Sequence, residues 1–205
     1  FSSGSVYGVK KEKKVTEDLN LEPISVYNKT KMIAERIFLS YKNDIDITCL
    51  RPATVCGLSE RLRLDLTVNK LTFDGYFKKK ILVDGGGQIR PNVNIKDLIR
   101  AVDHFLFTKK KSNHNIFNVG FENYSILDIA KKIQKKTGAK ILVNKTVDIR
   151  SYRQNSNRLI RSGFKPKYSV EDAINELILE FKNKKKKNFG IRNFNLKKMK
   201  ELNVK

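Results

Sequence analysis

The sequence has little of what several classes of protein require. Its 205 residues include only two cysteines, Cys49 and Cys56, with no His/Cys cluster around them, so we expect neither a metal site nor a disulfide framework. No apolar run approaches the roughly 18 residues of a membrane span, and no charged-then-apolar signal peptide opens the chain. These absences favour a protein of the reducing cytoplasm that makes no contact with a membrane.

Acidic residues are also scarce beside basic ones. There are 21 Asp and Glu against 43 Lys and Arg, a formal net charge of +22. Such a surface attracts polyanions, including nucleic acid. The excess lies mostly in lysine runs at 78–80, 109–111, 131–136 and 184–187, however, and the sequence has neither zinc-finger spacing nor an RNA-recognition aromatic strand. We expect only nonspecific nucleic-acid binding, and a basic polyanion-binding protein is the alternative function.

Among the residues that are present, Tyr27 and Lys31 lie one turn apart on a helix predicted at 25–42. The face expected to be buried is apolar at Thr30, Ala34, Ile37, Phe38 and Tyr41. A phenol loses its proton only near about pH 10 in water, and a fixed ammonium one turn away stabilises the phenolate. Such a tyrosine can take a proton from a sugar or alcohol hydroxyl as a hydride leaves the carbon. Ser3, ahead of a tight turn at 6–8, could hold the same hydroxyl oxygen by a hydrogen bond.

A lone Tyr-x-x-x-Lys pair on an amphipathic helix is usually structural. Here it stands between Ser-Ser-Gly-Ser-Val-Tyr-Gly at 2–8 and Leu-Arg-Pro-Ala-Thr-Val-Cys-Gly at 50–57. In this order the chain resembles the extended short-chain dehydrogenase/reductase family, specifically the NAD-dependent epimerases and dehydratases that act on nucleotide sugars. The resemblance implies that Ser3, Tyr27 and Lys31 are catalytic.

The resemblance also assigns binding residues. The expected cofactor is NAD, with NADP as an alternative, and the residues that would bind it are Ser2, Tyr27, Lys31, Pro52 and Val55. A nucleotide-diphosphate sugar is the expected substrate, and the residues that would contact it are Ser5, Thr54, Arg63, Asn69, Arg90 and Arg153. Arg90 follows a Gly-rich hairpin at 85–88 that is similar to the family's diphosphate-gripping segment, and a guanidinium suits two phosphate oxygens. Residues 116–120, 148–153 and 163–166 resemble later family motifs, of which 148–153 is the arginine motif that closes on the nucleotide.

Some positions depart from the family pattern. Asn94 stands where the family has a histidine, and Cys56 where it commonly has a tyrosine. The family's 4,6-dehydratases follow the catalytic hydroxyl with an Asp-Glu pair that eliminates water, whereas this chain has Gly4 and Ser5. We therefore expect epimerisation or ketone reduction at a sugar carbon rather than dehydration. A catalytically inactive fragment is the alternative.

The strand, Gly-x-x-Gly-x-x-Gly turn and helix that open a dinucleotide-binding fold do not occur in the sequence. We expect the chain to be the carboxy-terminal part of a longer protein, to bind NAD poorly by itself and, when full length, to form a homodimer through the helix that carries Tyr27. The expected fold is α/β: the second half of a doubly wound parallel sheet plus a smaller α/β substrate-binding domain. The predicted segments are 1–57 (Rossmann), 58–94 (substrate), 95–120 (Rossmann), 121–181 (substrate) and 182–205 (a polar tail that we expect to be partly mobile).

Hydropathy patterns predict strands at 1–7, 45–55, 81–84, 116–119 and 141–143. They predict helices at 25–42, 68–78, 95–107, 126–137 and 170–181. In the helix at 95–107, the side chains expected to point inward are Leu98, Val102, Phe105 and Leu106.

Overall fold

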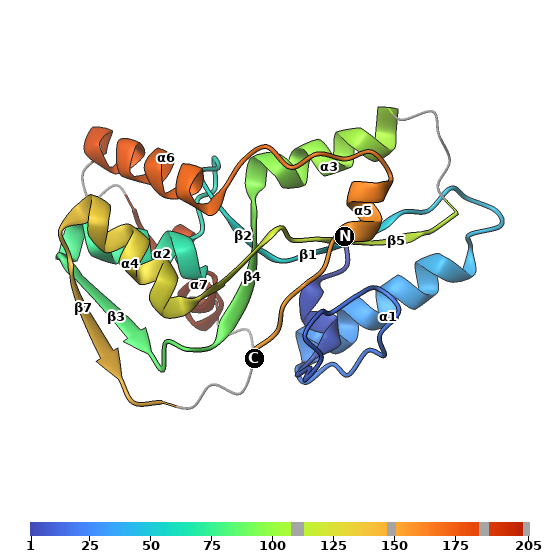
Figure 1. Ribbon diagram of the computed structural model, residues 1–205, viewed down its shortest axis with the longest axis horizontal. Coiled ribbons are helices and arrows are strands. Elements are labelled where there is room, and N and C mark those ends of the chain that lie inside the picture. Colours follow the sequence, from blue (N-terminus) through green and yellow to red (C-terminus); the bar gives the residue numbers. More distant parts are fainter. Residues whose placement is uncertain (108–112, 147–150, 185–188, 203–205) are drawn as a thin grey trace.

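The computed structural model describes residues 1–107, 113–146, 151–184 and 189–202. They form two lobes, each built around a short parallel strand pair with helices packed on it (Figure 1). In this part of the chain, none of the helices is both long enough and apolar enough to cross a bilayer.

The first lobe carries the amino-terminal motifs. Its strands β1 (Cys49–Pro52) and β5 (Ile116–Val119) pair in parallel, with Leu50 opposite Phe117. The helices of this lobe are α1 (Val26–Ser40), α3 (Ile95–Phe107) and α5 (Asn157–Arg161), preceded by a 3-10 turn, η1 (Gly4–Tyr7). Between the lobes, β2 (Thr54–Cys56) pairs in parallel with β4 (Ile89–Asn94), which pairs antiparallel with β6 (Glu122–Ser125).

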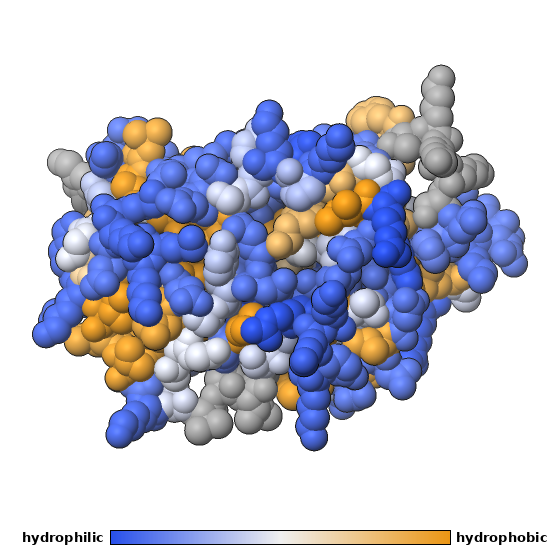
Figure 2. Space-filling view, in the orientation of Figure 1, coloured by the Kyte–Doolittle hydropathy of each residue, from blue (hydrophilic) through white to orange (hydrophobic). Residues whose placement is uncertain are grey.

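The second lobe is built on β3 (Lys80–Asp84) and β7 (Lys140–Asn144), which pair in parallel. Its helices are α2 (Thr67–Phe73), continued by a π turn (Asp74–Lys78), α4 (Ile126–Thr137), α6 (Val170–Asn183), a 3-10 turn (Ile191–Asn193) and α7 (Asn195–Glu201). One face of β3 and β7 stays exposed at the paired residues Leu82 and Leu142, and Figure 2 shows an apolar patch over this end of the molecule.

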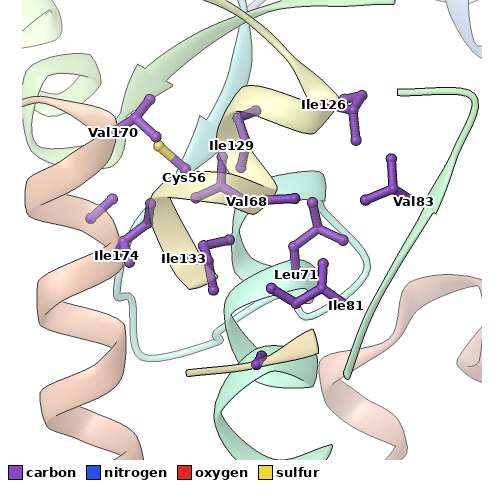
Figure 3. Packing of buried hydrophobic residues seen from close by; sticks show 13 residues of the cluster. Cys56, Val68, Leu71, Ile81, Val83, Ile126, Ile129, Ile133, Val170 and Ile174 are labelled. Atoms are coloured by element: carbon purple, nitrogen blue, oxygen red, sulfur yellow. The ribbon is translucent and has the colours of Figure 1, made fainter. Parts of the chain in front are cut away.

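The core of the second lobe explains why α4 and α6 form where the apolar pattern places them. Ile129 and Ile133 of α4 are fully buried and lie between Ile81 of β3 and Ile174 of α6 (Figure 3). Burying one such side chain contributes about 1.5–3 kcal/mol. Serine hydroxyls cap the first turns of both helices, and at Ser169 of α6 the capping box is complete.

All five predicted helices are confirmed, although the one expected at 68–78 changes from α to π geometry after Phe73. Two of the predicted strands are wrong. Residues 4–7 form η1 instead of extending a strand, because the Ser3 hydroxyl accepts the N–H of Ser5 and caps the turn. The backbone of this segment bonds to β1 through Ser2, whose N–H donates to Leu50 O at 2.8 Å. The strand expected at 45–55 is two strands, because the chain changes partner at Ala53, from β5 to β4.

The expected burial of α1 is wrong. Ile37, Phe38 and Tyr41 are 55%, 60% and 53% exposed, whereas the buried residues of the helix are Asn28 and Glu35. The inward-facing stripe of the helix is therefore polar. Asn28 bonds to Ser5 there, and Glu35 bonds to Arg51. On α3, Leu98, Val102 and Phe105 do pack on the core, but Leu106 is 69% exposed and does not point inward.

Several elements have no clear sequence signal. β4 contains Pro91, and β6 lacks the alternation of apolar and polar residues that is typical of a strand, so neither matches a strand pattern. Within the predicted polar tail, residues 189–195 contact the second lobe. There Phe189 and Phe194 join an aromatic cluster around Phe73, and Asn193 is only 4% exposed.

Candidate active site

The turn η1 and the first turn of α1 are joined by a chain of hydrogen bonds. Ser3 Oγ lies 2.8 Å from Ser5 Oγ, which donates to Asn28 Oδ1 at 2.7 Å. Asn28 is in the first turn of α1, and its N–H is capped by the Ser25 hydroxyl at 3.2 Å. These bonds fix the segment that carries Ser3 against the turn that carries Tyr27.

Lys31 makes a second connection, from α1 to the residues that precede η1. Its Nζ donates to Phe1 O at 3.1 Å, so the lysine ammonium is held beside the start of the chain. Tyr27, one turn earlier on the same stripe of α1, is 57% exposed. The three predicted catalytic residues thus lie on two elements in direct contact, and their catalytic roles remain predictions.

Three of the residues predicted to bind the cofactor, Ser2, Pro52 and Val55, lie on or beside β1 and β2, whereas Tyr27 and Lys31 lie on α1. Ser2 is buried beside Leu50, and its hydroxyl finds no hydrogen-bond partner among the residues that the structure describes. Pro52 ends β1 and Val55 lies in β2, both half-buried. Ligands of parallel α/β sheets bind outside the carboxyl ends of the strands, and this edge has that position.

Two predicted substrate residues, Arg90 and Arg153, lie on neighbouring segments at β4. Arg90 is half-buried on this strand, opposite Tyr124 of β6. The segment that contains Arg153 runs alongside, since Ile89 donates its N–H to Ser151 Oγ at 3.0 Å and accepts the N–H of Tyr152 at 3.3 Å. Thr54 lies across from Asn92 on the neighbouring β2. Residues 148–150 of the late arginine motif, like 109–111 and 185–187 of the lysine runs, lie outside the described residues.

Two other predicted substrate residues, Asn69 and Arg63, already form hydrogen bonds with other residues of the protein. Asn69 is 3% exposed, accepts the N–H of Gly57 at 3.0 Å and donates to Arg63 O at 3.0 Å, so it orders the chain between β2 and α2. Arg63 binds both carboxylate oxygens of Asp65, at 3.0 and 3.1 Å. Burial raises the pKa of Asp65, but the hydrogen bonds and charge of Arg63 outweigh it and lower that pKa overall. A substrate would have to draw Arg63 away from this pair.

Sequence reasoning missed a buried polar network behind the site. Arg51 of β1 pairs with Glu35 of α1 and donates to the phenol oxygen of Tyr7 in η1 at 2.8 Å. Burial raises the pKa of Tyr7 to about 12, although the Arg51 charge and hydrogen bond act in the opposite direction. Tyr7 therefore stays protonated at neutral pH and donates to Asn118 Oδ1 at 2.8 Å. The available signal was Glu35 itself, one turn beyond Lys31 on the stripe of Tyr27.

A separate cleft of about 770 Å³ lies between the loop before Asp18 and α5. Its lining is polar, with Lys14, Arg158 and Arg161 among the charged residues. None of the predicted site residues lines it.

A family model, described as the NAD dependent epimerase/dehydratase family, matches residues 1–120. The chain belongs to this family. It is 32% identical over 161 residues to UDP-glucose 4-epimerase of Lactobacillus helveticus, which covers 68% of this chain and 48% of that protein. An uncharacterised UDP-glucose epimerase of Bacillus subtilis is 31% identical over 142 residues, with 68% and 44% covered.

Solved structures of the family agree. UDP-glucuronic acid 4-epimerase of Bacillus cereus, solved with UDP-glucuronic acid and NAD, superposes with a TM-score of 0.77 at 30% identity, covering 89% of this chain and 60% of that one. The α/β fold class with parallel strand pairs is thereby confirmed. The chain spans about half the length of the curated relatives that it matches.

Proposed function

We propose that the chain is the catalytic and substrate-binding part of a NAD-dependent enzyme that epimerises a nucleotide sugar, or reduces its ketone, by hydride transfer at a sugar carbon. The observation that carries this proposal is the contact between η1 and α1, which sets Ser3 beside the turn bearing Tyr27 and Lys31. The similarity to UDP-glucose 4-epimerase supports the substrate class.

In this mechanism Tyr27 moves the proton. Its phenolate takes the proton of a sugar hydroxyl as the carbon is oxidised, and returns it when the ketone is reduced. Lys31 places a positive charge one turn away on the same stripe of α1. Ser3 donates a hydrogen bond to the same sugar oxygen and orients it. These three residues supply the acid, the base and the alignment of the reacting hydroxyl.

The residues at the end of β1 fit a nicotinamide nucleotide. The buried Ser2 hydroxyl, which has no partner in the described part of the chain, and the ammonium of Lys31 are donors for ribose or carboxamide oxygens. Pro52 and Val55 offer an apolar surface for the ring. When bound there, NAD accepts a hydride from the sugar and can return it. NADP is the alternative.

Arg90 and Arg153 are proposed to bind the diphosphate. They lie on adjacent segments, and each guanidinium can donate two parallel hydrogen bonds to phosphate oxygens. Ser5, Thr54, Arg63 and Asn69 complete the proposed substrate set. Because Gly4 and Ser5 replace the acidic pair of the dehydratases, epimerisation or ketone reduction is favoured over loss of water.

The same proposal includes two parts of the chain with different roles. Residues 1–57 and 95–120 bind the cofactor, and residues 58–94 and 121–181 bind the substrate. It also includes a cytoplasmic location and dimer formation through α1. Besides Tyr27, the apolar side chains of this helix and its C-cap that are more than half exposed are Val26, Ile33, Ile37, Phe38 and Tyr41, and these five form the proposed dimer surface. A second copy of the chain would remove this surface from water.

The test is to express the complete reading frame that contains these 205 residues and to incubate it with NAD and a panel of UDP-, GDP-, CDP- and dTDP-sugars. An epimerase interconverts two sugars with no net change in NADH absorbance, whereas a reductase forms one NADH for each sugar hydroxyl that it oxidises with NAD, and consumes one NADH for each ketone when NADH and the keto sugar are supplied instead. Absence of turnover with every sugar, together with salt-dependent binding of nucleic acid, would reject the proposal in favour of a polyanion-binding protein.

A further inference from the structure

A buried ion pair connects α1 to β1. Arg51 Nη2 lies 2.5 Å from Glu35 Oε1 and Arg51 Nε lies 3.0 Å from Glu35 Oε2, so the pair is bidentate. The side chains are 3% and 2% exposed. Two parallel hydrogen bonds between planar groups fix orientation as well as distance.

The same guanidinium also holds η1. Arg51 Nη1 donates to Tyr7 Oη at 2.8 Å, and the guanidinium carbon lies 4.9 Å from the centre of the Tyr7 ring. Tyr7 in turn donates to Asn118 of β5 at 2.8 Å. Arg51 Nη1 also donates to Glu17 O at 3.2 Å, which fixes the loop between η1 and α1.

Each element in this network carries a residue of the proposed site. Glu35 is one turn from Lys31 and two turns from Tyr27 on a single stripe of α1, so fixing Glu35 fixes the rotation of that stripe. Tyr7 follows Ser3 by four residues in the same turn, and Arg51 precedes Pro52. One guanidinium thus joins the three backbone segments whose relative placement decides whether Ser3 and Tyr27 can reach one sugar oxygen.

A buried ion pair is a poor way to gain stability. Desolvation of the two charges consumes most of their attraction, and an apolar pair of similar volume is often as good or better. What the charged pair adds over an apolar one is directional bonding, which a positioning role requires.

We propose that Glu35, Arg51 and Tyr7 form a positioning unit that sets Tyr27 and Ser3 at the geometry needed for proton transfer. The inference rests on the proposed function, since it assumes that Tyr27 is the acid/base. The three residues of the unit touch neither substrate nor cofactor; they act through α1, η1 and β1.

The test uses the complete reading frame with Glu35→Gln, which keeps the size of the side chain and removes its charge. Ile133→Val, in the core of the other lobe, is the control for a general loss of stability. Misplacement of the reacting groups should lower kcat of Glu35→Gln by about 100-fold with KM for the nucleotide sugar within about 2-fold. Ile133→Val should leave kcat unchanged.

A double-mutant cycle separates positioning from folding. Once Tyr27→Phe has removed the phenol, adding Glu35→Gln should reduce the residual turnover by less than about 2-fold, because no acid/base is left to misplace. An equal reduction in both backgrounds would mean that Glu35 affects only the folded fraction, and would overturn the proposal.

Hydrogen exchange supplies a readout that does not depend on turnover. Glu35→Gln should accelerate amide exchange in η1 and in the first half of α1, and leave α4 unchanged; Ile133→Val should do the reverse. Unchanged protection of η1 and α1 in Glu35→Gln would overturn the positioning unit even if the enzyme is active. If the wild-type protein turned over no nucleotide sugar, the proposed function would fail, and exchange alone would decide whether the unit holds these elements.

Discussion

Asp97 on α3 offers a sharp test of how the two lobes are held together. Its side chain is fully buried, and its two oxygens accept the backbone N–H of Lys167, at 2.8 and 3.1 Å, and that of Tyr168, at 2.8 Å. Arg100, on the next turn of α3, donates a hydrogen bond of 2.5 Å to the same carboxylate. One carboxylate therefore fixes the chain that leads from the first lobe into α6.

The loss on replacing Asp97 by alanine can be estimated from these bonds. A hydrogen bond to a charged group contributes about 1.5–3 kcal/mol. The substitution leaves three donors without their acceptor: the backbone N–H groups of Lys167 and Tyr168 and the guanidinium of Arg100. Because Lys167 and Arg100 are partly exposed, water can replace some of the lost hydrogen bonds. We expect Asp97→Ala to lower the free energy of unfolding by about 3–5 kcal/mol, which for a chain of this size lowers Tm by about 6–20 °C.

The assay is urea unfolding followed by far-UV circular dichroism, with Asp103→Ala as the matched control. Asp103 lies on the same helix and is exposed. Its replacement should change stability by no more than about 0.5 kcal/mol. If the two variants differed by less than about 1 kcal/mol, the reasoning that Asp97 anchors the segment before α6 would be refuted.

Four other variants or titrations test separate claims. Tyr27→Phe should lower turnover about 100-fold or more with KM nearly unchanged, and full activity in steady-state assays would remove Tyr27 as the acid/base. Arg90→Ala should raise KM for the nucleotide sugar, and an unaltered KM would remove its diphosphate role. Gly8→Ala should destabilise by at least about 2 kcal/mol in urea unfolding, because φ is +72° and the new Cβ would meet Glu22 O at 2.0 Å; Gly138→Ala, with φ +67° and open space, should lose only about 1 kcal/mol. The pKa of Tyr7, raised to about 12 in the folded protein, means that the unfolded chain releases this proton first, near about pH 10. The Tyr7 contribution to stability should therefore be complete below pH 10 and be lost as pH rises toward 12, and Tyr7→Phe should flatten that alkaline loss in denaturant titrations.

The sequence predicted the helices well because their apolar residues recur at the helical period. In α4, Ile126, Ile129 and Ile133 are all buried, and Ser125 marks the start. The order of motifs around Tyr27 predicted the family, which the family match confirms. For these features, local patterns and short motifs carry the information.

The errors arise where tertiary contacts override local patterns. Sequence periodicity placed Ile37 and Phe38 of α1 inside, but the pairing of Glu35 with Arg51, 16 residues later, turns the polar stripe inward. The strand β4 contains Pro91 and still pairs on both sides, because the ladder with β2 begins only at Asn92 and Pro91 is paired only with Asn123 of β6. Both partner strands come from distant parts of the chain. Neither contact is visible within a short window of sequence.

The packing of the tail has a consequence for where this polypeptide can be shortened. By its hydropathy the chain could be cut after α6 at little cost, because lysines and other polar residues dominate the tail. Yet Leu62 O accepts from Asn193 at 2.7 Å, Leu64 donates to Asn193 O at 2.8 Å, and Phe189 lies edge-on against both Phe73 and Phe181. A protein ending at residue 184 would expose those rings and release the segment bearing Arg63. The boundary that a sequence suggests for expression or crystallisation would thus remove residues that pack on the second lobe.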